Sequence, residues 1–496
     1  MKYNHTLAFT LALIGSMGGQ AIGQVATSDL FGRTPFRELA ATWPGVMNAV
    51  HVQGMVVGVI HGDSISTHAL GYCDAEARTP PSTNSPAYIA SVTKVFVAQA
   101  IMQLAQDGKV DLDAPVRTYL PRFRLADSTA SATITIRDLL AHRKGLESWA
   151  ITFGEAYTGQ MNDERYYRLL SQVEPGSEFS YSNLHYTLLG KVIESVTGLS
   201  WKQYVEDRVF APSVMRSTHA AVATLADSRA MRPLEHGLDG YRMPDERKTD
   251  RTMHAAGGVV STCEDLLRWL HMHMHDGRDA NGPVISGIVV RSMYESQVAL
   301  PEEHPFIPGQ SRTGWGLGWM LREHRGATFV VHNGLFAGAA AFIGFLPKER
   351  IGVVVLANAK EPGMWMCETV VAQLLDRLLG LSTQSYQDPL PPWFAAAAGE
   401  PVEEPKSKDG VGTTLPGSAY DGRFSNADWG ELDVTFDGHE LRLRIGDLPL
   451  PLEWTGADTF IAGGDHEGSF MLQKGQVVAV ELGMPLPDKA RFTRAR

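Results

Sequence analysis

Cysteine is scarce in this chain of 496 residues. The three thiols, Cys73, Cys263 and Cys367, lie far apart and show no C-x-x-C spacing. Three cysteines cannot form a disulfide framework, and without paired spacing they do not suggest a zinc cluster. One disulfide among them is conceivable, but their wide separation favours three structural thiols.

An excess of positive charge and long apolar segments are also lacking. The 44 Lys and Arg residues are outnumbered by 55 Asp and Glu residues, which gives a formal net charge of -11. An acidic chain of this kind is a poor partner for nucleic acid. No segment approaches the ~20 apolar residues that a membrane-spanning helix needs. No internal repeat with a period of about 20–50 residues is visible, which argues against solenoids and propellers.

The composition itself is that of an ordinary globular protein, with 44% hydrophobic and 20% charged residues. It excludes wholesale disorder and collagen-like or coiled-coil architectures. At roughly 150 residues per domain the length predicts about three domains, although one large domain with a small companion fits equally well.

Residues 1–23 have the features of a secretory signal peptide. Lys2 precedes an apolar stretch over residues 7–17, and Ala21-Ile22-Gly23 supplies a small-x-small cleavage sequence. A buried N-terminal helix is the alternative. We therefore expect cleavage after Gly23 and a periplasmic or secreted protein.

A mixed α/β (α+β) domain is predicted over residues 30–384. An apolar run at residues 55–60 with a return segment predicts an early β-hairpin. Three strand-like runs come late in this domain, at residues 328–331, 339–346 and 351–358. Helical patterns lie between the hairpin and these runs, at residues 91–106, 186–196 and 266–274. We therefore expect one sheet built from both ends of the domain, flanked by helices, with a helical subdomain inserted.

The composition of the chain changes at about residue 385 and again at about residue 416. Residues 385–415 are rich in proline and alanine, which predicts a linker. Residues 416–496 alternate apolar and polar side chains between turn sequences such as Asp437-Gly438. A segment of about 80 residues with this pattern predicts a small antiparallel β-barrel or sandwich.

The sequence Ser91-Val92-Thr93-Lys94 opens the first strongly helical segment. Residues i and i+3 share a helix face, so the ammonium of Lys94 can reach the hydroxyl of Ser91. A buried lysine with a depressed pKa can be the base that a serine nucleophile needs. Alone, S-x-x-K recurs by chance about once in a chain of this length, and it also fits a helix cap with a surface lysine.

Tyr181 and Asn183 lie two residues apart in an extended segment that leads into a helix. Their side chains therefore point the same way and can enter one cavity. A tyrosine hydrogen-bonded to lysine can relay the serine proton, and the amide of Asn183 can hold Lys94. In isolation, a capping asparagine after a core tyrosine is the more common explanation.

The third element is His332-Asn333-Gly334, which we expect to end the strand at residues 328–331. A glycine beside a site lets the backbone approach a substrate. The N–H of Leu335 can then pair with that of Ser91 as an oxyanion hole. By itself this sequence is better explained as a hairpin turn with an exposed histidine.

Taken together and in this order, the three elements resemble a known group. S-x-x-K on a helix, Y-x-N further on and [KH]-x-G on a late strand are the marks of serine β-lactamases and penicillin-binding proteins. The resemblance is strongest to the class C β-lactamase-like branch, which also holds carboxylesterases, D-aminopeptidases and D-alanyl-D-alanine carboxypeptidases. Supporting segments lie at residues 139–146, 255–262 and 315–319.

The resemblance covers about residues 35–380 and implies a β-lactamase-like antiparallel sheet flanked by helices. Residues 416–496 resemble the lipocalin-like β-barrel that is often appended to such hydrolases. The implied enzyme is a serine hydrolase without a metal or other cofactor. Its expected partners are small-molecule ester, peptide or β-lactam substrates, with no nucleic acid and no membrane span, and its oligomeric state stays open.

The resemblance also implies roles for individual residues. Ser91 attacks and forms an acyl-enzyme, while Lys94 and Tyr181 transfer protons. The expected supporting and substrate-binding residues are Asn183, His332, Asn333, Gly334 and Leu335. Independently of the resemblance, Trp149, Trp315 and Trp319 can line a substrate pocket, although packing of a strand against a helix explains Trp315 and Trp319 at least as well.

One departure from the class C pattern bears on the substrate. Class C β-lactamases have a lysine where this chain has His332, and the loss of that cation removes a partner for a β-lactam carboxylate. We therefore favour hydrolysis of an ester or a small amide or peptide. β-Lactamase, D-alanyl-D-alanine carboxypeptidase or D-aminopeptidase activity is the alternative, and a non-catalytic protein that binds cell-wall peptides is a further one.

Three histidines, His271, His273 and His275, alternate with methionines in a predicted helix. Only His271 and His275 share a helix face, and no acidic residue nearby suggests itself as a third metal ligand. We interpret the cluster as a solvated helix end and expect no metal there.

Overall fold

The computed structural model describes residues 26–27, 29–237, 239–279, 281–300, 307, 309–382, 412–464, 466–484 and 489–495. The predicted signal peptide (1–23) and most of the predicted linker (385–411) lie outside the described residues. Among the helices of this described part, none is both long and apolar enough to cross a membrane.

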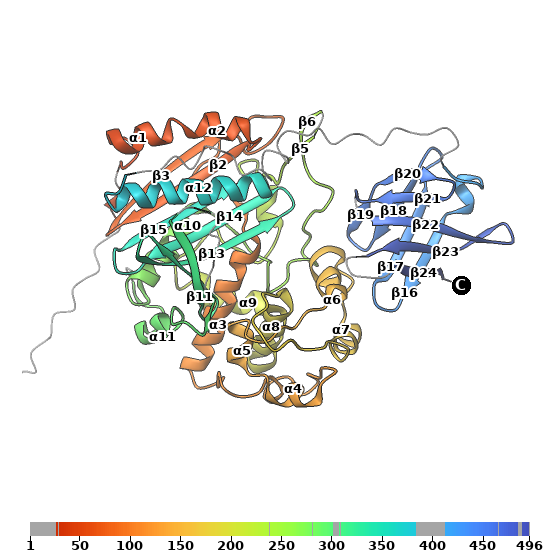
Figure 1. Ribbon diagram of the computed structural model, residues 1–496, viewed down its shortest axis with the longest axis horizontal. Helices are drawn as coiled ribbons and strands as arrows, with labels where there is room; N and C mark the ends of the chain where they lie inside the picture. Colours follow the sequence, from red (N-terminus) through yellow and green to blue (C-terminus); the bar gives the residue numbers. More distant parts are fainter. Residues whose placement is uncertain are drawn as a thin grey trace, which may run out of the picture.

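A nine-stranded sheet organises the larger part of the chain (Figure 1). Its order is β1-β3-β2-β15-β14-β13-β12-β11-β10, and neighbours are antiparallel except β1 with β3. The strands are β1 (Ala26–Thr27), β2 (Gly54–His61), β3 (Ser64–Gly71), β10 (Val298–Ala299), β11 (Gln310–Trp315), β12 (Met320–His324), β13 (Ala327–Phe336), β14 (Ala339–Leu346) and β15 (Ile351–Ala357). Strand β2 pairs with β15, so both ends of the domain build one sheet, as predicted.

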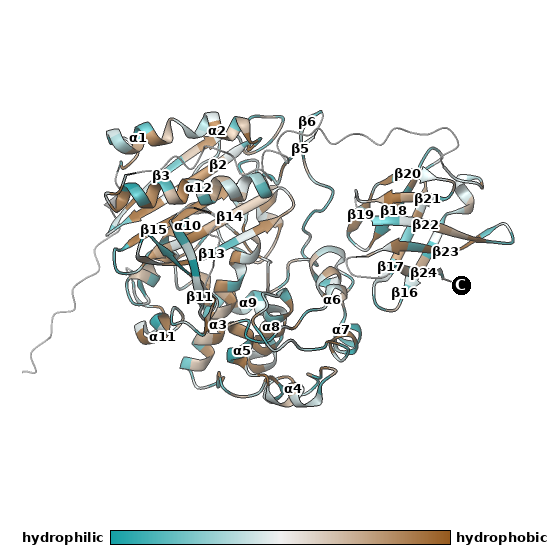
Figure 2. Cartoon of the chain, viewed as in Figure 1, coloured by the Kyte–Doolittle hydropathy of each residue, from teal (hydrophilic) through white to brown (hydrophobic). Residues whose placement is uncertain are grey.

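Helices cover both faces of this sheet (Figure 1). The main ones are α1 (Thr34–Ala40), α2 (Trp43–Ala49), α3 (Thr93–Gln106), α10 (Cys263–Met274) and α12 (Glu361–Leu378). Val353 and Val355 of β15 share a core with α1, α2 and α12, whereas Val354 and Leu356 share a second core with α3 and α10. Successive side chains of a strand point to opposite faces, so a strand between two helical layers is apolar throughout. Figure 2 shows this apolar centre, which confirms the buried central strand predicted at residues 351–356.

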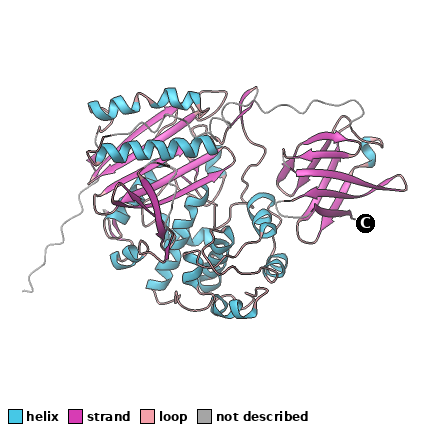
Figure 3. Cartoon of the chain, viewed as in Figure 1, coloured by secondary structure: helices cyan, strands magenta, loops and turns pink. Residues whose placement is uncertain are grey.

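A helical subdomain lies beside the sheet (Figure 3). Its helices are α4 (Ser128–Thr133), α5 (Ile136–Leu140), α6 (Trp149–Phe153), α7 (Asp163–Leu170), α8 (Asn183–Thr197) and α9 (Trp201–Val205). Helix α8 begins at Asn183, three residues before the predicted start at residue 186. The earlier start arises because Ser182 caps the helix and accepts a 3.1 Å hydrogen bond from the N–H of Leu184. The cap is therefore Ser182, and Asn183 lies in the first turn.

Short elements connect these parts. They are η1 (Ala90–Val92), η2 (Val116–Thr118), the π-helical turns η3 (Gly154–Thr158) and η4 (Glu206–Phe210), η5 (Ala223–Ala226), β4 (Ala87–Tyr88), β5 (Glu235–Gly237), β6 (Gly240–Arg242), β7 (Val260–Ser261), β8 (Arg278–Asp279), β9 (Gly282–Pro283) and α11 (Gly287–Ser292). All three cysteines are buried free thiols, as the sequence favours.

The C-terminal part is a second nine-stranded sheet, closed into a nearly complete antiparallel barrel (Figure 1). After η6 (Gly417–Ala419), its strands are β16 (Gly422–Asn426), β17 (Gly430–Phe436), β18 (Leu441–Ile445), β19 (Leu448–Leu450), β20 (Leu452–Gly456), β21 (Thr459–Ala462), β22 (His466–Gln473), β23 (Gln476–Gly483) and β24 (Lys489–Arg494). Tyr420, Phe424 and Phe470 belong to its core. This confirms the predicted small β-barrel.

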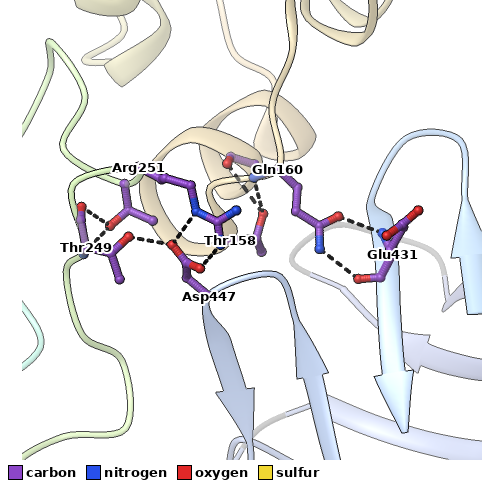
Figure 4. Close-up of polar contacts among 8 residues, drawn as sticks. Thr158, Gln160, Thr249, Arg251, Glu431 and Asp447 are labelled. Carbon is purple, nitrogen blue, oxygen red and sulfur yellow. Dashed lines mark hydrogen bonds and ion pairs between the residues drawn. The ribbon is translucent and has the colours of Figure 1, made fainter. Parts of the chain in front are cut away.

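The barrel is docked on the larger part through specific polar contacts (Figure 4). Asp447, in the turn between β18 and β19, accepts hydrogen bonds from the hydroxyl of Thr249 and from Nε of Arg251. Gln160 and the backbone of Glu431 exchange two hydrogen bonds, of 2.9 and 2.7 Å. The barrel therefore holds the segments around residues 158–160 and 249–251 in place.

Candidate active site

Ser91 lies in the turn η1, directly before α3. The preceding residue, Ala90, has φ 45° and therefore adopts a left-handed conformation that costs an alanine about 1–3 kcal/mol. This strained turn presents Ser91 beside the first turn of α3, where Lys94 lies. The amine of Lys94 is 2.9 Å from Oγ of Ser91. The i to i+3 geometry expected from the sequence is therefore present.

The side chain of Lys94 is completely buried. Its Nζ makes three contacts: Oγ of Ser91 at 2.9 Å, Oδ1 of Asn183 at 2.8 Å and the carbonyl of Ala256 at 2.7 Å. Burial, reinforced by the charge of Lys248, holds the pKa of Lys94 well below its usual range. A neutral amine can donate to Asn183 and Ala256 and still offer a lone pair to the hydroxyl of Ser91.

Tyr181 lies on the other side of Ser91 and Lys94. Its ring is 4.9 Å from Nζ of Lys94, and a side-chain hydrogen bond joins it to Ser91. The residue is 40% exposed, but its hydroxyl end is turned inward. Burial raises the pKa of Tyr181, and the hydrogen bond to Ser91 only partly opposes this. The phenol is therefore protonated at neutral pH. Because the pKa of Lys94 is lowered while that of Tyr181 is raised, the amine of Lys94 loses its proton more easily than the phenol does.

Strand β13 passes directly beside Ser91. A Cβ added to Gly334 would lie 2.1 Å from the carbonyl oxygen of Ile89 and 3.0 Å from the backbone nitrogen of Ser91. Strand β12 pairs with β13 only as far as Val331, so the edge of β13 beyond it faces η1 instead of another strand. Glycine is needed here for close approach of two backbones. The side chain of Leu335 is exposed at this edge.

His332 is not in an exposed turn. It is buried inside β13, opposite Ile343 of β14, because β13 continues to Phe336 instead of ending at residue 331. Its Nδ1 is 2.8 Å from the carbonyl of Asn333. Burial and the nearby Lys94 lower the pKa of His332 to about 3. The third motif therefore presents a neutral imidazole, and the hairpin-turn explanation is wrong.

Trp149 begins helix α6 and is half-buried there. The aromatic rings packed on Tyr181 are instead those of Trp315, with centroids 5.5 Å apart, and His142, at 4.7 Å. The described ring contacts therefore bring Trp315, and not Trp149, to Tyr181.

Comparison with known proteins shows the family to which the chain belongs. The family model described as Beta-lactamase matches residues 39–374. The chain belongs to the beta-lactamase family. Within this family it is 29% identical over 317 residues to penicillin-binding protein 4 of Amycolatopsis lactamdurans, covering 62% of this chain and 81% of the relative. It is 28% identical over 331 residues to protein flp of Staphylococcus aureus strain MW2, of which it spans 60%.

Solved structures show the same fold. The octameric penicillin-binding protein homologue from Pyrococcus abyssi has a TM-score of 0.61 at 22% identity, covering 92% of this chain and 99% of the other. A class C beta lactamase from Rhodobacter sphaeroides has a TM-score of 0.52 at 21% identity, covering 67% and 98%. D-amino acid amidase from Ochrobactrum anthropi SV3 has a TM-score of 0.56 at 26% identity, covering 69% and 98%. These beta-lactamase-fold neighbours support a hydrolase.

One residue that the sequence did not reveal acts on the site: the charge of Lys248 contributes to the low pKa of Lys94. Lys248 lines a cavity of about 240 Å³ together with residues that include Tyr88 and Phe336. Nζ of Lys248 is 2.6 Å from the carbonyl of Ala156 and 4.2 Å from the ring centre of Phe336. Burial of this amine lowers the pKa of Lys248 to about 7, although Glu246 opposes the shift. Only the folded chain brings residue 248 to the site, so no local pattern could have indicated it.

Proposed function

We propose that this beta-lactamase family member is a serine hydrolase that cleaves ester or small amide or peptide bonds through an acyl-enzyme on Ser91. The observation that supports it most strongly is the 2.9 Å contact between Oγ of Ser91 and the completely buried amine of Lys94. A serine hydroxyl is a weak nucleophile until a neighbouring base accepts its proton. Lys94 can be that base because its surroundings disfavour the charged form.

In the proposed first step, Oγ of Ser91 attacks the substrate carbonyl carbon and its proton passes to Nζ of Lys94. The N–H groups of Ser91 and Leu335 stabilise the oxyanion. Tyr181 and the newly charged Lys94 then supply the proton that the leaving alcohol or amine takes away. Because the pKa of Tyr181 is raised, the phenol stays protonated, so it passes a proton to the leaving group only as it takes one up from the charged Lys94.

The second step uses the same groups in reverse. A water molecule attacks the acyl carbon, and its proton passes to the neutral amine of Lys94 or through Tyr181. The ester bond to Ser91 breaks, Oγ regains a proton, and the free acid leaves. Asn183 and the carbonyl of Ala256 keep Nζ in position through both steps, since they are its other two contacts.

The neutral His332 favours an ester or small amide or peptide over a β-lactam, because no fixed cation stands at the third motif. The likeness to D-amino acid amidase at 26% identity favours D-aminopeptidase or amidase activity as the second candidate. β-Lactamase or D-alanyl-D-alanine carboxypeptidase activity and non-catalytic binding of cell-wall peptides complete the candidates. We also propose a periplasmic or secreted location, on the basis of residues 1–23.

The test is a comparison of kcat/KM on three chromogenic substrates: a short-chain nitrophenyl ester, a D-alanine anilide and a cephalosporin. We expect the ester or the anilide to be the best substrate and S91A to be inactive on all three. A dominant cephalosporinase rate would overturn the order of preference. Activity that survives S91A would overturn the proposed nucleophile.

A further inference from the structure

A second cluster of chemically active side chains lies where α10 ends. His271 and His275 are one helical turn apart on α10, with their rings stacked at a centroid separation of 3.8 Å. Asp63, in the turn between β2 and β3, faces both of them. One ligand atom from each of the three residues can be chosen so that all lie within 4.8 Å of one another. The expectation that no acidic residue accompanies these histidines is therefore wrong.

The imidazole nitrogens of this cluster are oriented for an additional partner. Nδ1 of His275 is 2.7 Å from the carbonyl of His271, so this nitrogen carries the proton and Nε2 keeps its lone pair. That Nε2 is 3.0 Å from Oδ1 of Asp63. A hydrogen bond from the other ring nitrogen to a backbone carbonyl is the usual support of a metal-binding histidine.

His271 supplies the second independent observation. The residue is 4% exposed, and its Nε2 is buried without a hydrogen-bond partner among the described residues. The atom lies 3.9 Å from Asp63, which is beyond hydrogen-bond distance. An unpaired buried nitrogen of this kind is costly unless a ligand satisfies it.

Arg350, from the turn between β14 and β15, places its guanidinium against Oδ1 of Asp63 and Nε2 of His275. A cation therefore already lies beside the carboxylate of Asp63. The side chain of Arg350 is 43% exposed and can swing outward.

We propose that Asp63, His271 and His275 form a binding site for a divalent transition-metal ion, with Zn²⁺ as the best fit to the donors. Two imidazole nitrogens and one carboxylate oxygen are a common three-ligand set for Zn²⁺, and a water molecule completes the tetrahedron. The metal takes the position of the Arg350 guanidinium, which moves into solvent.

This site is separate from the proposed hydrolytic centre. Asp63 follows the end of β2 that pairs with Ile351, whereas Gly334 and Ser91 lie toward the end of β15 at Ala357. Six residues of strand separate these ends, which is about 20 Å at about 3.3 Å per residue. A metal here joins α10 to the β2–β3 hairpin, so it stabilises the fold and does not contact the substrate.

The experiment is calorimetric titration of ZnCl2 into full-length protein that carries no affinity tag and has been stripped with EDTA. We expect one Zn²⁺ per chain, a rise in Tm on binding, and at least tenfold weaker binding in D63N. Asp63 is 61% exposed, so this variant keeps its fold even where H271A or H275A does not. H439A, which changes a histidine on an exposed turn of the barrel, is the matched control and binds as the parent does.

R350Q gives an independent arm of the test. Removal of the competing positive charge strengthens binding of a cation at the same point by at least about tenfold. No stoichiometric binding by the parent, equal affinity in D63N, or failure of R350Q to bind more tightly would each overturn the proposed site. Hydrolysis of a nitrophenyl ester is measured in parallel, and it is unchanged by D63N because the site lies apart from Ser91.

Discussion

The backbone of β13 at Gly334 lies close to the backbone of the turn that holds Ser91. The substitution Gly334→Ala therefore perturbs the geometry of the site directly. The added Cβ would lie 2.1 Å from the carbonyl oxygen of Ile89 and 3.0 Å from the nitrogen of Ser91. Contacts under 3.0 Å do not persist, so β13 and the nucleophile turn must separate by at least 0.9 Å (3.0 minus 2.1). Neither atom is the end of a flexible side chain, and β14 blocks retreat of β13 on its other side.

A displacement of about 1 Å between a nucleophile and the groups that stabilise its transition state costs about 100-fold in rate. That corresponds to about 2.7 kcal/mol of transition-state stabilisation. We therefore expect kcat/KM of G334A on a nitrophenyl ester to fall about 100-fold, with a similar fall in the rate of labelling by a fluorophosphonate. Thermal unfolding is measured alongside, so that a loss of fold is not mistaken for a loss of alignment.

G45A is the matched control. Gly45 lies in helix α2, a Cβ there meets nothing within 4 Å, and alanine favours a helix by about 1 kcal/mol over glycine. This variant keeps its activity and has an equal or higher Tm. A folded G334A enzyme with kcat/KM within twofold of the parent would refute the placement of β13 against Ser91.

Two further predictions concern Lys248 and the docking of the barrel. Lys248→Met removes a charge that lowers the pKa of Lys94, so Lys94 holds its proton to higher pH. The acid limb of the kcat/KM profile therefore moves to higher pH in K248M and does not move in the surface variant K360M, which is the control. An unmoved acid limb in K248M would show that this charge does not act on the base. Asp447→Ala removes a carboxylate that is 11% exposed, so Thr249 and Arg251 lose their hydrogen-bond acceptor. Docking of the barrel weakens by about 1–3 kcal/mol. Calorimetry detects this loss as a lower or split unfolding transition. The control is E453A, at an exposed position of the same barrel, which leaves the unfolding transition unchanged. An unchanged transition in D447A as well would contradict the docking role of Asp447.

Much of the fold follows from local pattern. The apolar run at residues 351–356 is a central strand because only a strand covered on both faces lacks polar alternation. The alternating residues after position 416 form a barrel for the converse reason, since one face is buried and the other is solvated. Ser91 and Lys94 meet because i and i+3 positions share a helix face, and this spacing is visible in the sequence.

The features that the sequence missed depend on contacts between distant segments. Taken by itself, the sequence around His332 favoured an exposed turn, but pairing with Ile343 extends β13 and buries this histidine. Asp63 reaches the histidines of α10 only because β2 runs beneath that helix, so no spacing rule connects them. Lys248 has no motif around it, and its low pKa arises from burial that only the folded chain creates.

The central claim is that Ser91 becomes acylated, and intact-protein mass spectrometry tests it most directly. Full-length protein is mixed with a fluorophosphonate or a slowly hydrolysed ester, and the adduct is located by peptide mapping. We expect one adduct per chain on the peptide that contains Ser91, absent in folded S91A and strongly slowed in K94M. No adduct on the parent, or equal labelling of S91A, would contradict it.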